Sequence, residues 1–501
     1  MRSAYLLQRQ DMARQRIEPS VAVLDIGTSN IRASAVNSEG LITSQFRNKF
    51  TTVSPTRGFV EFDAEELYQN CASLLAQLLA ARDCSAIAIT NQRASTVVFD
   101  PVSKKPICPG QSWQDIRTAP MCLAIKSPGI SISPNQSASK IALMMDLFDK
   151  DRSRGLMGGT IDAWLTFRLT GQFKTEHTNA AMSGLVEPNA TRYDDAILAK
   201  LNIPEHCLPR IQQSISYFGE AIIGDNKLPL MAILGDQQAS MLGQGITRAG
   251  QAKATFGTGA MVDIVTEQTG PSSTNRLRNG TFPIVARSQG TDIVFGLEAI
   301  GLHAGSAVEF ACRNLGLADS PMHLEEIARR SRQGSTEVFV PALTGLATPA
   351  WDFGALGAFT NITHATTKFE LANAVLTGIA HIGADLIRAI EADGNTNLEH
   401  LSVDGGMTQN QLFLQHLANF SQKLLNLSPT REATTVGAGL AAHIALGNIA
   451  SISELSELTT PRITIEPQTS FRRNLAASRE GWEKAVGIAR NSVPELSAVI
   501  F

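Results

Sequence analysis

Cysteine is scarce in this chain of 501 residues, and the few cysteines have no paired spacing. No two of the six form a Cys-x-x-Cys pair, and no paired histidine spacing accompanies them. This pattern excludes a zinc knuckle, a thioredoxin-like redox motif and a disulfide framework. We expect reduced, mostly buried thiols, as in a cytosolic protein, at positions 71, 84, 108, 122, 207 and 312.

Long apolar runs and a dominant charge of one sign are also missing. No uninterrupted apolar run approaches the roughly 18 residues that a membrane-spanning helix needs. The chain has 43 Lys and Arg against 46 Asp and Glu, which gives a formal net charge of -3. A chain so balanced lacks the strong positive field of most nucleic-acid-binding proteins. We expect no nucleic-acid partner, no membrane partner and a cytoplasmic location.

The composition is that of a folded protein with more than one domain. Hydrophobic residues make up 43% and charged residues 18% of the chain. A length of 501 residues predicts two to four domains of about 100–200 residues each. Residues 1–18 contain arginines but no apolar segment, so they do not resemble a secretory signal. We interpret them as a disordered or weakly ordered leader and expect the folded body to begin near Val21.

Short apolar segments recur along the chain, and each ends in a polar turn. They are expected to be buried strands, and they cover residues 21–24, 86–90, 231–234, 253–256 and 401–403. Helical patterns lie between them, at 64–81, at 411–425, and from the capping box of Thr367 and Glu370 to the stop at Asp393-Gly394. Strands that alternate with helices predict an α/β fold.

The arrangement of strand, Gly-Thr turn and second strand occurs twice, at residues 25–30 and 256–260. Two similar halves that each open with such a turn predict two domains facing one cleft. We place the boundary so that an N-terminal domain covers residues 19–247 and a C-terminal domain covers residues 248–501.

Both Gly-Thr turns suit a phosphate group. Glycine lets the backbone approach a ligand closely. Successive N–H groups, with the hydroxyls of Thr28, Ser29 and Thr258, can then donate to phosphate oxygens. A single turn of this kind is usually only a hairpin. Two of them, each after a buried strand, favour a nucleoside triphosphate held between the domains.

Asp25 and Asp236 each follow an apolar strand directly, where side chains face a cleft. Phosphates repel a carboxylate unless a cation lies between them, and Mg²⁺ is held by one or two carboxylates together with phosphate oxygens. The other carboxylate can accept a hydroxyl proton during phosphoryl transfer. Taken singly, each aspartate is better explained as a residue that caps a turn. Beside two Gly-Thr turns, the catalytic interpretation is favoured.

Other residues remain ambiguous from the sequence alone. The planar guanidinium of Arg93 can donate hydrogen bonds to sugar hydroxyls or to a carboxylate. A salt bridge between two secondary-structure elements explains this residue equally well. Trp113 can form an apolar surface against the carbon chain of a ligand, although a tryptophan buried in the core is commoner. The Gly405-Gly406 turn lets a flat base approach the backbone, or it allows close helix packing.

Taken together, these motifs resemble the FGGY carbohydrate kinases, and most of all their glycerol kinase branch, over about residues 21 to 450. Order and spacing agree throughout. The matching segments are Asp25-Ile26-Gly27-Thr28-Ser29 and residues 89–93, 113–118, 159–165, 235–238, 256–259, 341–346 and 403–406.

The resemblance implies two actin-like ATPase domains, of the ribonuclease H-like type, flanking a central cleft that holds ATP and a polyol. It implies ATP-dependent phosphorylation of a hydroxyl on a small polyol or sugar, with Mg²⁺. By position, Asp236 matches the catalytic base, and Asp25 and Asp236 lie near the metal. The implied substrate contacts are Arg93, Trp113, Asn135, Asp236 and Gln237. The implied nucleotide contacts are Thr28, Ser29, Arg32, Thr258, Gly305, Glu309, Gly406 and Asn410.

The chain departs from the glycerol kinase pattern mainly at positions that the resemblance assigns to substrate contacts. Ala94 stands where those enzymes have Glu, Asn135 where they have Tyr, and Glu309 where they usually have Gln. The first two changes remove or alter hydrogen-bond partners of the polyol. A site that bonds a hydroxyl discriminates strongly, so we expect weaker glycerol binding or a different acceptor.

Three functions therefore stay open at this point. The first is a glycerol kinase-like enzyme, and the second is a ketose kinase of the xylulokinase or ribulokinase type. The third is a sensor of the same fold that binds nucleotide and sugar without catalysis. A homodimer or a homotetramer is compatible with each of them.

Overall fold

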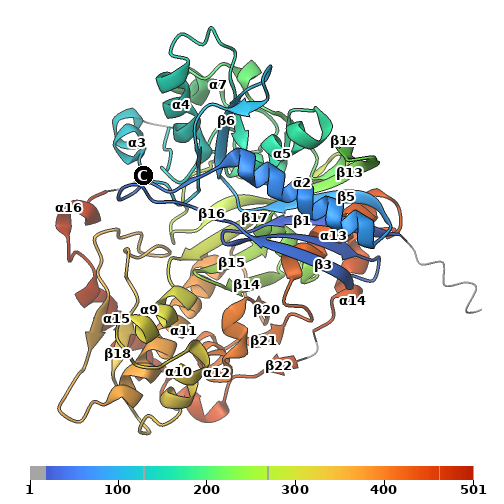
Figure 1. Ribbon diagram of the computed structural model, residues 1–501. Coiled ribbons are helices and arrows are strands. Elements are labelled where there is room, and N and C mark those ends of the chain that lie inside the picture. Colours follow the sequence, from blue (N-terminus) through green and yellow to red (C-terminus); the bar gives the residue numbers. More distant parts are fainter. Residues whose placement is uncertain (1–18, 128–129, 268–269, 462, 500–501) are drawn as a thin grey trace, which may run out of the picture.

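A computed structural model describes residues 19–127, 130–267, 270–461 and 463–499 of the chain. The leader expected at residues 1–18 lies outside the described residues. Strands and helices alternate along the chain, as the sequence predicts for an α/β fold. In Figure 1 the earlier half of the chain, in blue and green, lies above the later half, in yellow and orange. We call residues 19–247 the N-terminal lobe and residues 248–499 the C-terminal lobe.

The strands of the N-terminal lobe form one side of a large mixed sheet. Its order is β3 (Ile42–Lys49), β2 (Asn30–Val36), β1 (Ser20–Ile26), β5 (Cys84–Asn91), β13 (Asn226–Gly235) and β12 (Ile215–Ile223). The β1–β2 pair is the first predicted hairpin, with Asp25 opposite Arg32. The central strands β1, β5 and β13 run parallel, so their carboxyl ends lie at one edge of the sheet.

The C-terminal lobe repeats this plan. Its order is β16 (Phe282–Gln289), β17 (Asp292–Gly301), β15 (Ala260–Val265), β14 (Ala252–Phe256), β20 (His400–Asp404), β21 (Leu424–Leu427) and β22 (Ile463–Ile465). The second predicted hairpin is β14–β15, and β20 and β21 run parallel to β14. One residue pair, Ile215 with Gln289, joins the two parts of the sheet.

Both lobes share one strand order. When five strands of each lobe are numbered along the chain, leaving out β12, β16 and β22, both β3-β2-β1-β5-β13 and β17-β15-β14-β20-β21 read 3-2-1-4-5. The internal repeat predicted from the two Gly-Thr turns is therefore present as a repeat of the whole topology. The sequence expectation of two ribonuclease H-like lobes agrees with this order.

The predicted helices cover these strands. Helix α2 (Ala64–Ala81) has the predicted bounds, and Asp63 caps it by accepting from two backbone N–H groups. Helix α11 (Lys368–Asp393) begins with the predicted capping box and is followed by Gly394. The stretch 411–425 differs from expectation, because α12 (Gln411–Ser421) ends early. Gln422 takes a left-handed conformation, and the chain then enters β21.

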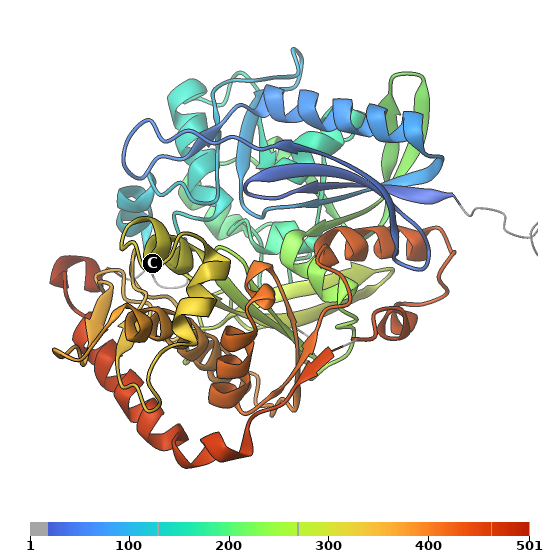
Figure 2. The ribbon, with the colours of Figure 1, turned by 60° about the horizontal axis from the view of Figure 1, so that its bottom comes forward.

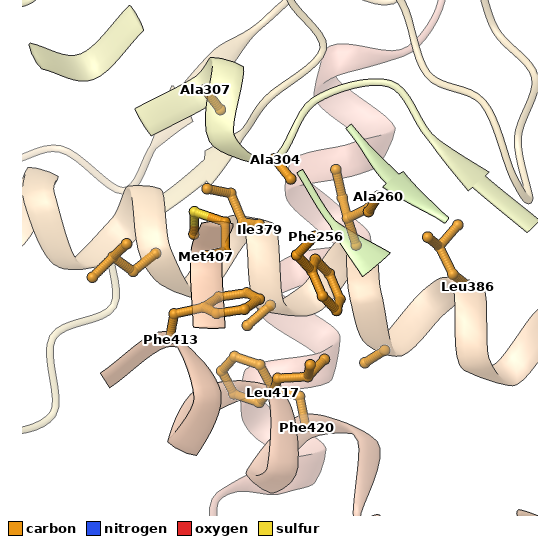
Figure 3. Packing of buried hydrophobic residues seen from close by; sticks show 14 of the residues in the cluster. Phe256, Ala260, Ala304, Ala307, Ile379, Leu386, Met407, Phe413, Leu417 and Phe420 are labelled. Atoms are coloured by element: carbon orange, nitrogen blue, oxygen red, sulfur yellow. The ribbon is translucent and has the colours of Figure 1, made fainter. Parts of the chain in front are cut away.

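The core of the C-terminal lobe lies directly beneath the second Gly-Thr turn. Figure 3 shows Phe256, the last residue of β14, packed among side chains of α11 and α12. Its ring meets that of Phe413 at 5.0 Å between centroids in an edge-to-face arrangement. Helix α15 (Leu475–Ala489, red) packs on the outer side of this lobe (Figure 2). The turn after Phe256 is thus anchored by a well-packed aromatic core.

Two helices connect the lobes at a close crossing. Helix α8 (Asp236–Gly243) follows β13, while α13 (Ala433–Ala445), from the later part of the chain, packs against β1, β5 and β13. A Cβ atom on Gly437 would lie 1.8 Å from the Ala239 carbonyl oxygen, and one on Gly243 would lie 1.9 Å from that of Ala433. The two backbones can approach this closely only because both positions are glycine.

The six cysteines lie in the described part of the chain, where all are free thiols, three of them buried and three partly buried. No helix among the described residues is both long enough and apolar enough to span a bilayer.

The close approach of α8 and α13 predicts that a single added methyl group at the crossing destabilises the fold. We expect Gly437→Ala to lower the free energy of unfolding by about 2 kcal/mol or more, because its Cβ would overlap backbone atoms that cannot move aside. Gly481→Ala, in the middle of α15 with open space around it, is the matched control and should raise stability by up to about 1 kcal/mol. Urea unfolding of both variants checks this, and equal stabilities would contradict it.

Candidate functional site

Strand register places the main candidates at one edge of the N-terminal sheet. Asp25 of β1 and Leu234 of β13 both pair with Thr90 of β5. Asp236 follows β13 directly, and Arg93 follows β5 by two residues. Adjacent strands are about 4.8 Å apart, so the Asp25 and Asp236 backbones lie roughly 10 Å apart, on either side of the segment that carries Arg93.

Asp236 is the first residue of α8 and is only partly covered. Its Oδ1 atom accepts a hydrogen bond from the Gln237 backbone N–H at 2.8 Å and lies 3.3 Å from Arg93 Nε. The side chain is 27% exposed, against 5% for Asp25. Burial of the surrounding site raises the pKa of Asp236, and the Arg93 guanidinium opposes that rise. The carboxylate is thus held in place and still accessible.

Arg93 connects the two lobes. Its guanidinium contacts Glu298 of β17 with two nitrogens, at 2.8 Å and 3.1 Å, in addition to the contact with Asp236. The sequence left a salt bridge and a substrate contact open for Arg93. The structure contains the salt bridge, and the same side chain fixes the candidate base.

Behind Arg93 lies a buried ladder of charges that the sequence interpretation missed. Asp263 of β15 faces Lys253 of β14 on one side and Glu298 of β17 on the other. Lys253 Nζ lies 2.8 Å from an Asp263 carboxylate oxygen, and both side chains are fully buried. The signal available in the sequence was Asp263 itself, a charged residue within the otherwise apolar segment 261–265.

Three carboxylates in this cluster, those of Asp236, Asp263 and Glu298, face only two cations, Arg93 and Lys253. Burial raises the pKa of Glu298 to about 8; Arg93 lowers it, and the facing Asp263 raises it further. Glu298 is therefore the group that retains a proton at neutral pH, which balances the buried charge.

Gln237 is turned toward the other lobe. It is buried, and its Oε1 atom accepts a hydrogen bond from Lys253 Nζ. Lys253 also donates to Thr255 Oγ1 at 2.8 Å. Gln237 therefore serves as a contact between the lobes next to Asp236, and its predicted role as a substrate contact stays a prediction.

Asp25 is held by groups from both parts of the chain. Thr435 Oγ1 of α13 donates to its Oδ2 atom at 2.7 Å, and Arg32 NH1 lies 3.4 Å from the same oxygen. Burial raises the pKa of Asp25 to about 6, while Arg32 and Thr435 lower it and the Asp236 charge raises it. Thr435 was not predicted, because nothing in the sequence pattern relates it to a position 410 residues away.

Two carboxylates at one sheet edge fit a Mg²⁺ ion that is shared with phosphate oxygens. Magnesium usually takes one or two carboxylates, with substrate phosphates and water completing an octahedron. Asp25 and Asp236 supply that donor set and sense each other's charge. Asp236 is the more accessible of the two.

The first Gly-Thr turn contacts Trp113, the residue predicted to line the substrate site. Trp113 Nε1 donates to Thr28 Oγ1 at 3.4 Å, and the indole is partly buried. Ser29, beside Thr28, is exposed at the tip of the turn. The side chain expected to face a polyol thus touches the turn expected to face phosphate.

The second Gly-Thr turn packs against the start of α9 (Gly305–Arg313). Gly305 N–H donates to the Gly257 carbonyl at 2.9 Å, and a Cβ on Gly305 would lie 2.7 Å from that same oxygen. Thr258 itself is exposed, and its carbonyl accepts from Ser306 N–H at 3.1 Å. Glycine is required at position 305 so that the helix can support the turn.

The remaining nucleotide candidates lie on other segments, and two of them have side-chain partners of their own. Glu309 is exposed and lies 3.5 Å from Arg313 on the same helix. Asn410 caps α12, since its Oδ1 atom accepts from Phe413 N–H at 2.8 Å. Gly406 is exposed beside the tight turn at Gly405. Their roles with nucleotide stay predictions.

The two departures from the glycerol kinase pattern have local structural roles. Asn135 donates from Nδ2 to the Trp113 carbonyl at 2.9 Å and accepts from Ser133 Oγ at 3.2 Å. Ala94 adopts a left-handed conformation with φ of 61° and is nearly buried. Ala94 has no polar side-chain atom, and the Asn135 amide is already engaged by its neighbours.

The charge ladder predicts a pH-dependent stability. The raised pKa of Glu298 stabilises the fold at low pH, and this contribution is lost as pH rises from about 4.5 toward about 8. We therefore expect Glu298→Gln to gain stability relative to wild type between pH 6 and pH 8.5, as measured by urea unfolding.

Glu370→Gln is the control for this measurement. Hydrogen bonds from Thr367 hold the pKa of buried Glu370 at about 2, so that variant should show no such gain over the same interval. A constant difference between Glu298→Gln and wild type would show that Glu298 is already ionised in the folded protein.

Comparison with known proteins agrees with this architecture. Residues 20–243 match the model of the FGGY family of carbohydrate kinases, N-terminal domain, and residues 252–446 match that of the C-terminal domain. The chain is 32% identical to a glycerol kinase of Azotobacter vinelandii, over 93% of this chain and 96% of that one. It is 34% identical to a glycerol kinase of Trichlorobacter lovleyi, over 93% and 98% of the two chains.

Solved structures show the same fold. The Plasmodium falciparum glycerol kinase with ADP superposes with a TM-score of 0.85 at 25% identity, covering 94% of this chain and 98% of that one. A xylulose kinase from Lactobacillus acidophilus superposes with a TM-score of 0.84 at 19% identity, covering 96% and 99%. The two-domain actin-like ATPase fold expected from the sequence is thereby confirmed. The chain belongs to the FGGY family of carbohydrate kinases.

Proposed function

We propose that this enzyme transfers the γ-phosphoryl group of ATP to a hydroxyl of a small polyol, in the manner of a glycerol kinase, with Asp236 as the general base. One observation carries the proposal. Asp236 is a partly exposed carboxylate, held by Arg93 and the Gln237 N–H, at the sheet edge that also presents Asp25 and the first Gly-Thr turn. Its environment suits a base that must be fixed and reachable.

Asp236 acts on the acceptor hydroxyl. As the oxygen of that hydroxyl forms its bond to the γ-phosphorus, its proton passes to a carboxylate oxygen of Asp236, and the bond to the β-phosphate oxygen breaks to release ADP. Arg93 favours the ionised carboxylate before the transfer, because its guanidinium lies 3.3 Å away. Trp113 offers an apolar face for the carbon chain of the acceptor.

The nucleotide is placed between the two Gly-Thr turns. Thr28, Ser29 and Arg32 would contact its phosphates from the N-terminal lobe, and Thr258 with the neighbouring Gly305 from the C-terminal lobe. Glu309, Gly406 and Asn410 would lie toward the adenosine. Mg²⁺, when bound at Asp25 and Asp236, would neutralise charge on the β- and γ-phosphates.

The identity of the acceptor rests on two opposing observations. Relatives named glycerol kinases match 93% of the chain at 32–34% identity, which supports glycerol. Ala94 has no polar side-chain atom, and the Asn135 amide is partly occupied by Trp113 and Ser133, where glycerol kinases hydrogen-bond the polyol; this favours a different or longer acceptor such as a five-carbon ketose. We also propose a cytoplasmic location, which the scarce, unpaired cysteines support.

A screen of ADP release with Mg·ATP over glycerol, erythritol, xylulose, ribulose and gluconate identifies the acceptor. We expect turnover with at least one of them. A higher kcat/KM for a ketose than for glycerol would assign the enzyme to the ketose kinases. Binding of ATP and sugar by calorimetry, without product from any acceptor, would instead show a non-catalytic sensor.

Removal of the proposed base is the second test. We expect Asp236→Asn to lower kcat by about 10²–10⁴-fold with the preferred acceptor, because an amide cannot take the hydroxyl proton. Its affinity for ADP should change little. Asp292→Asn, an exposed position at the start of β17, is the matched control and should behave as wild type. Unchanged turnover of the Asp236 variant would remove this residue as the base.

A further inference from the structure

Lys140 of α4 (Ser137–Phe148) is a fully buried cation with an unusual set of partners. Its Nζ atom donates to three backbone carbonyls, those of Ser112 at 2.7 Å, Asn135 at 2.9 Å and Ala94 at 3.4 Å. An ammonium group has three N–H donors, so each donor of Lys140 has a carbonyl acceptor. These carbonyls belong to three segments that are separate in sequence.

Each of these segments carries a side chain assigned above to the acceptor site. Ala94 follows Arg93, Ser112 precedes Trp113, and Asn135 is itself a candidate. Further bonds tie the segments together, because Trp113 N–H donates to Ser95 Oγ at 3.0 Å and Asn135 Nδ2 donates to the Trp113 carbonyl at 2.9 Å. Lys140 is the one side chain that donates to all three segments among the described residues.

Among the ion pairs of the described residues, none involves Lys140. Asp115, whose charge favours the ammonium form, forms no ion pair with it and is bonded instead to Arg117 and to the Val60 N–H. Burial lowers the pKa of Lys140 to about 7; Asp115 and Cys122 raise it, and Arg117 lowers it. A buried, unpaired ammonium is costly. Its three hydrogen bonds are the compensating interaction, so the position is not that of an ordinary core residue.

We propose that Lys140 is a positioning residue that sets the spacing of the three acceptor-site segments and thereby places Arg93 and Trp113 for the acceptor. The inference rests on the proposed function. Lys140 acts through backbone carbonyls and touches neither acceptor nor nucleotide. Its loss should therefore affect the acceptor selectively, since the two Gly-Thr turns make no contact with it among the described residues.

Lys140→Met tests this, because methionine keeps much of the length and removes every donor. We expect kcat/KM for the preferred acceptor to fall by about 30-fold or more, from the loss of three hydrogen bonds. The Kd for ADP, measured by calorimetry, should stay within about twofold of wild type. Lys140→Gln retains two N–H donors on a shorter chain, and we expect a smaller loss with the same selectivity.

Met145→Ala is the matched control. Met145 is fully buried on the same helix, so its truncation destabilises α4 without removing a bond to the three segments. We expect a lower Tm and an unchanged KM for the acceptor.

The outcomes separate the alternatives. Wild-type kcat/KM for the acceptor in folded Lys140→Met or Lys140→Gln would overturn the proposal, as would the same selective loss in Met145→Ala. If Lys140→Met does not fold, Lys140→Gln decides in its place. Absence of turnover in the wild-type protein would overturn the proposed function, and this inference with it.

Discussion

The buried guanidinium of Arg93 is the contact on which the proposed active site depends. It reaches Asp236 on one side and Glu298 on the other, and these residues belong to different lobes. Removal of the Asp236 carboxylate would leave the buried Arg93 guanidinium without its charged partner, which is destabilising. The position of the candidate base is therefore tied to the relative placement of the lobes.

The two candidate carboxylates are also linked through helices. Asp236 begins α8, and Thr435, which donates to Asp25, lies on α13. These helices cross in close contact at Gly243 and Gly437. Strand register sets where the two carboxylates lie relative to each other, and the α8–α13 pair holds the helices that carry Asp236 and Thr435 against this sheet, while a single strand pairing, Ile215 with Gln289, joins the two parts of the sheet. Lobe closure about this crossing is compatible with an enzyme that must exclude water during phosphoryl transfer.

Local patterns predicted most of the fold. Apolar segments that end in turns located the central strands, the Thr367–Glu370 capping box located α11, and the repeated Gly-Thr hairpin indicated two similar lobes. These features depend on neighbours in sequence. The end of α12 was missed because the apolar pattern continues into β21, and only the left-handed Gln422 and the following Lys423 separate the two elements.

The contacts that organise the site could not be predicted from local sequence patterns. Glu298, Lys253, Thr435 and Lys140 act on partners brought near by topology, up to 410 residues away along the chain. Asp263 was visible as a lone charge in an apolar strand, but its partners required the strand register. Sequence motifs thus indicated the candidate reacting groups, while the charges and hydrogen bonds that support these candidates required the fold.

The most direct measurement is a structure of the enzyme with its preferred acceptor, Mg²⁺ and a non-hydrolysable ATP analogue. We expect the reacting hydroxyl within about 3 Å of an Asp236 carboxylate oxygen and in line with the γ-phosphate. We also expect that phosphate to lie between the two Gly-Thr turns. An acceptor whose hydroxyl lies away from Asp236, with the carboxylate still engaged only by Arg93 and Gln237, would contradict the assignment of this residue as the base.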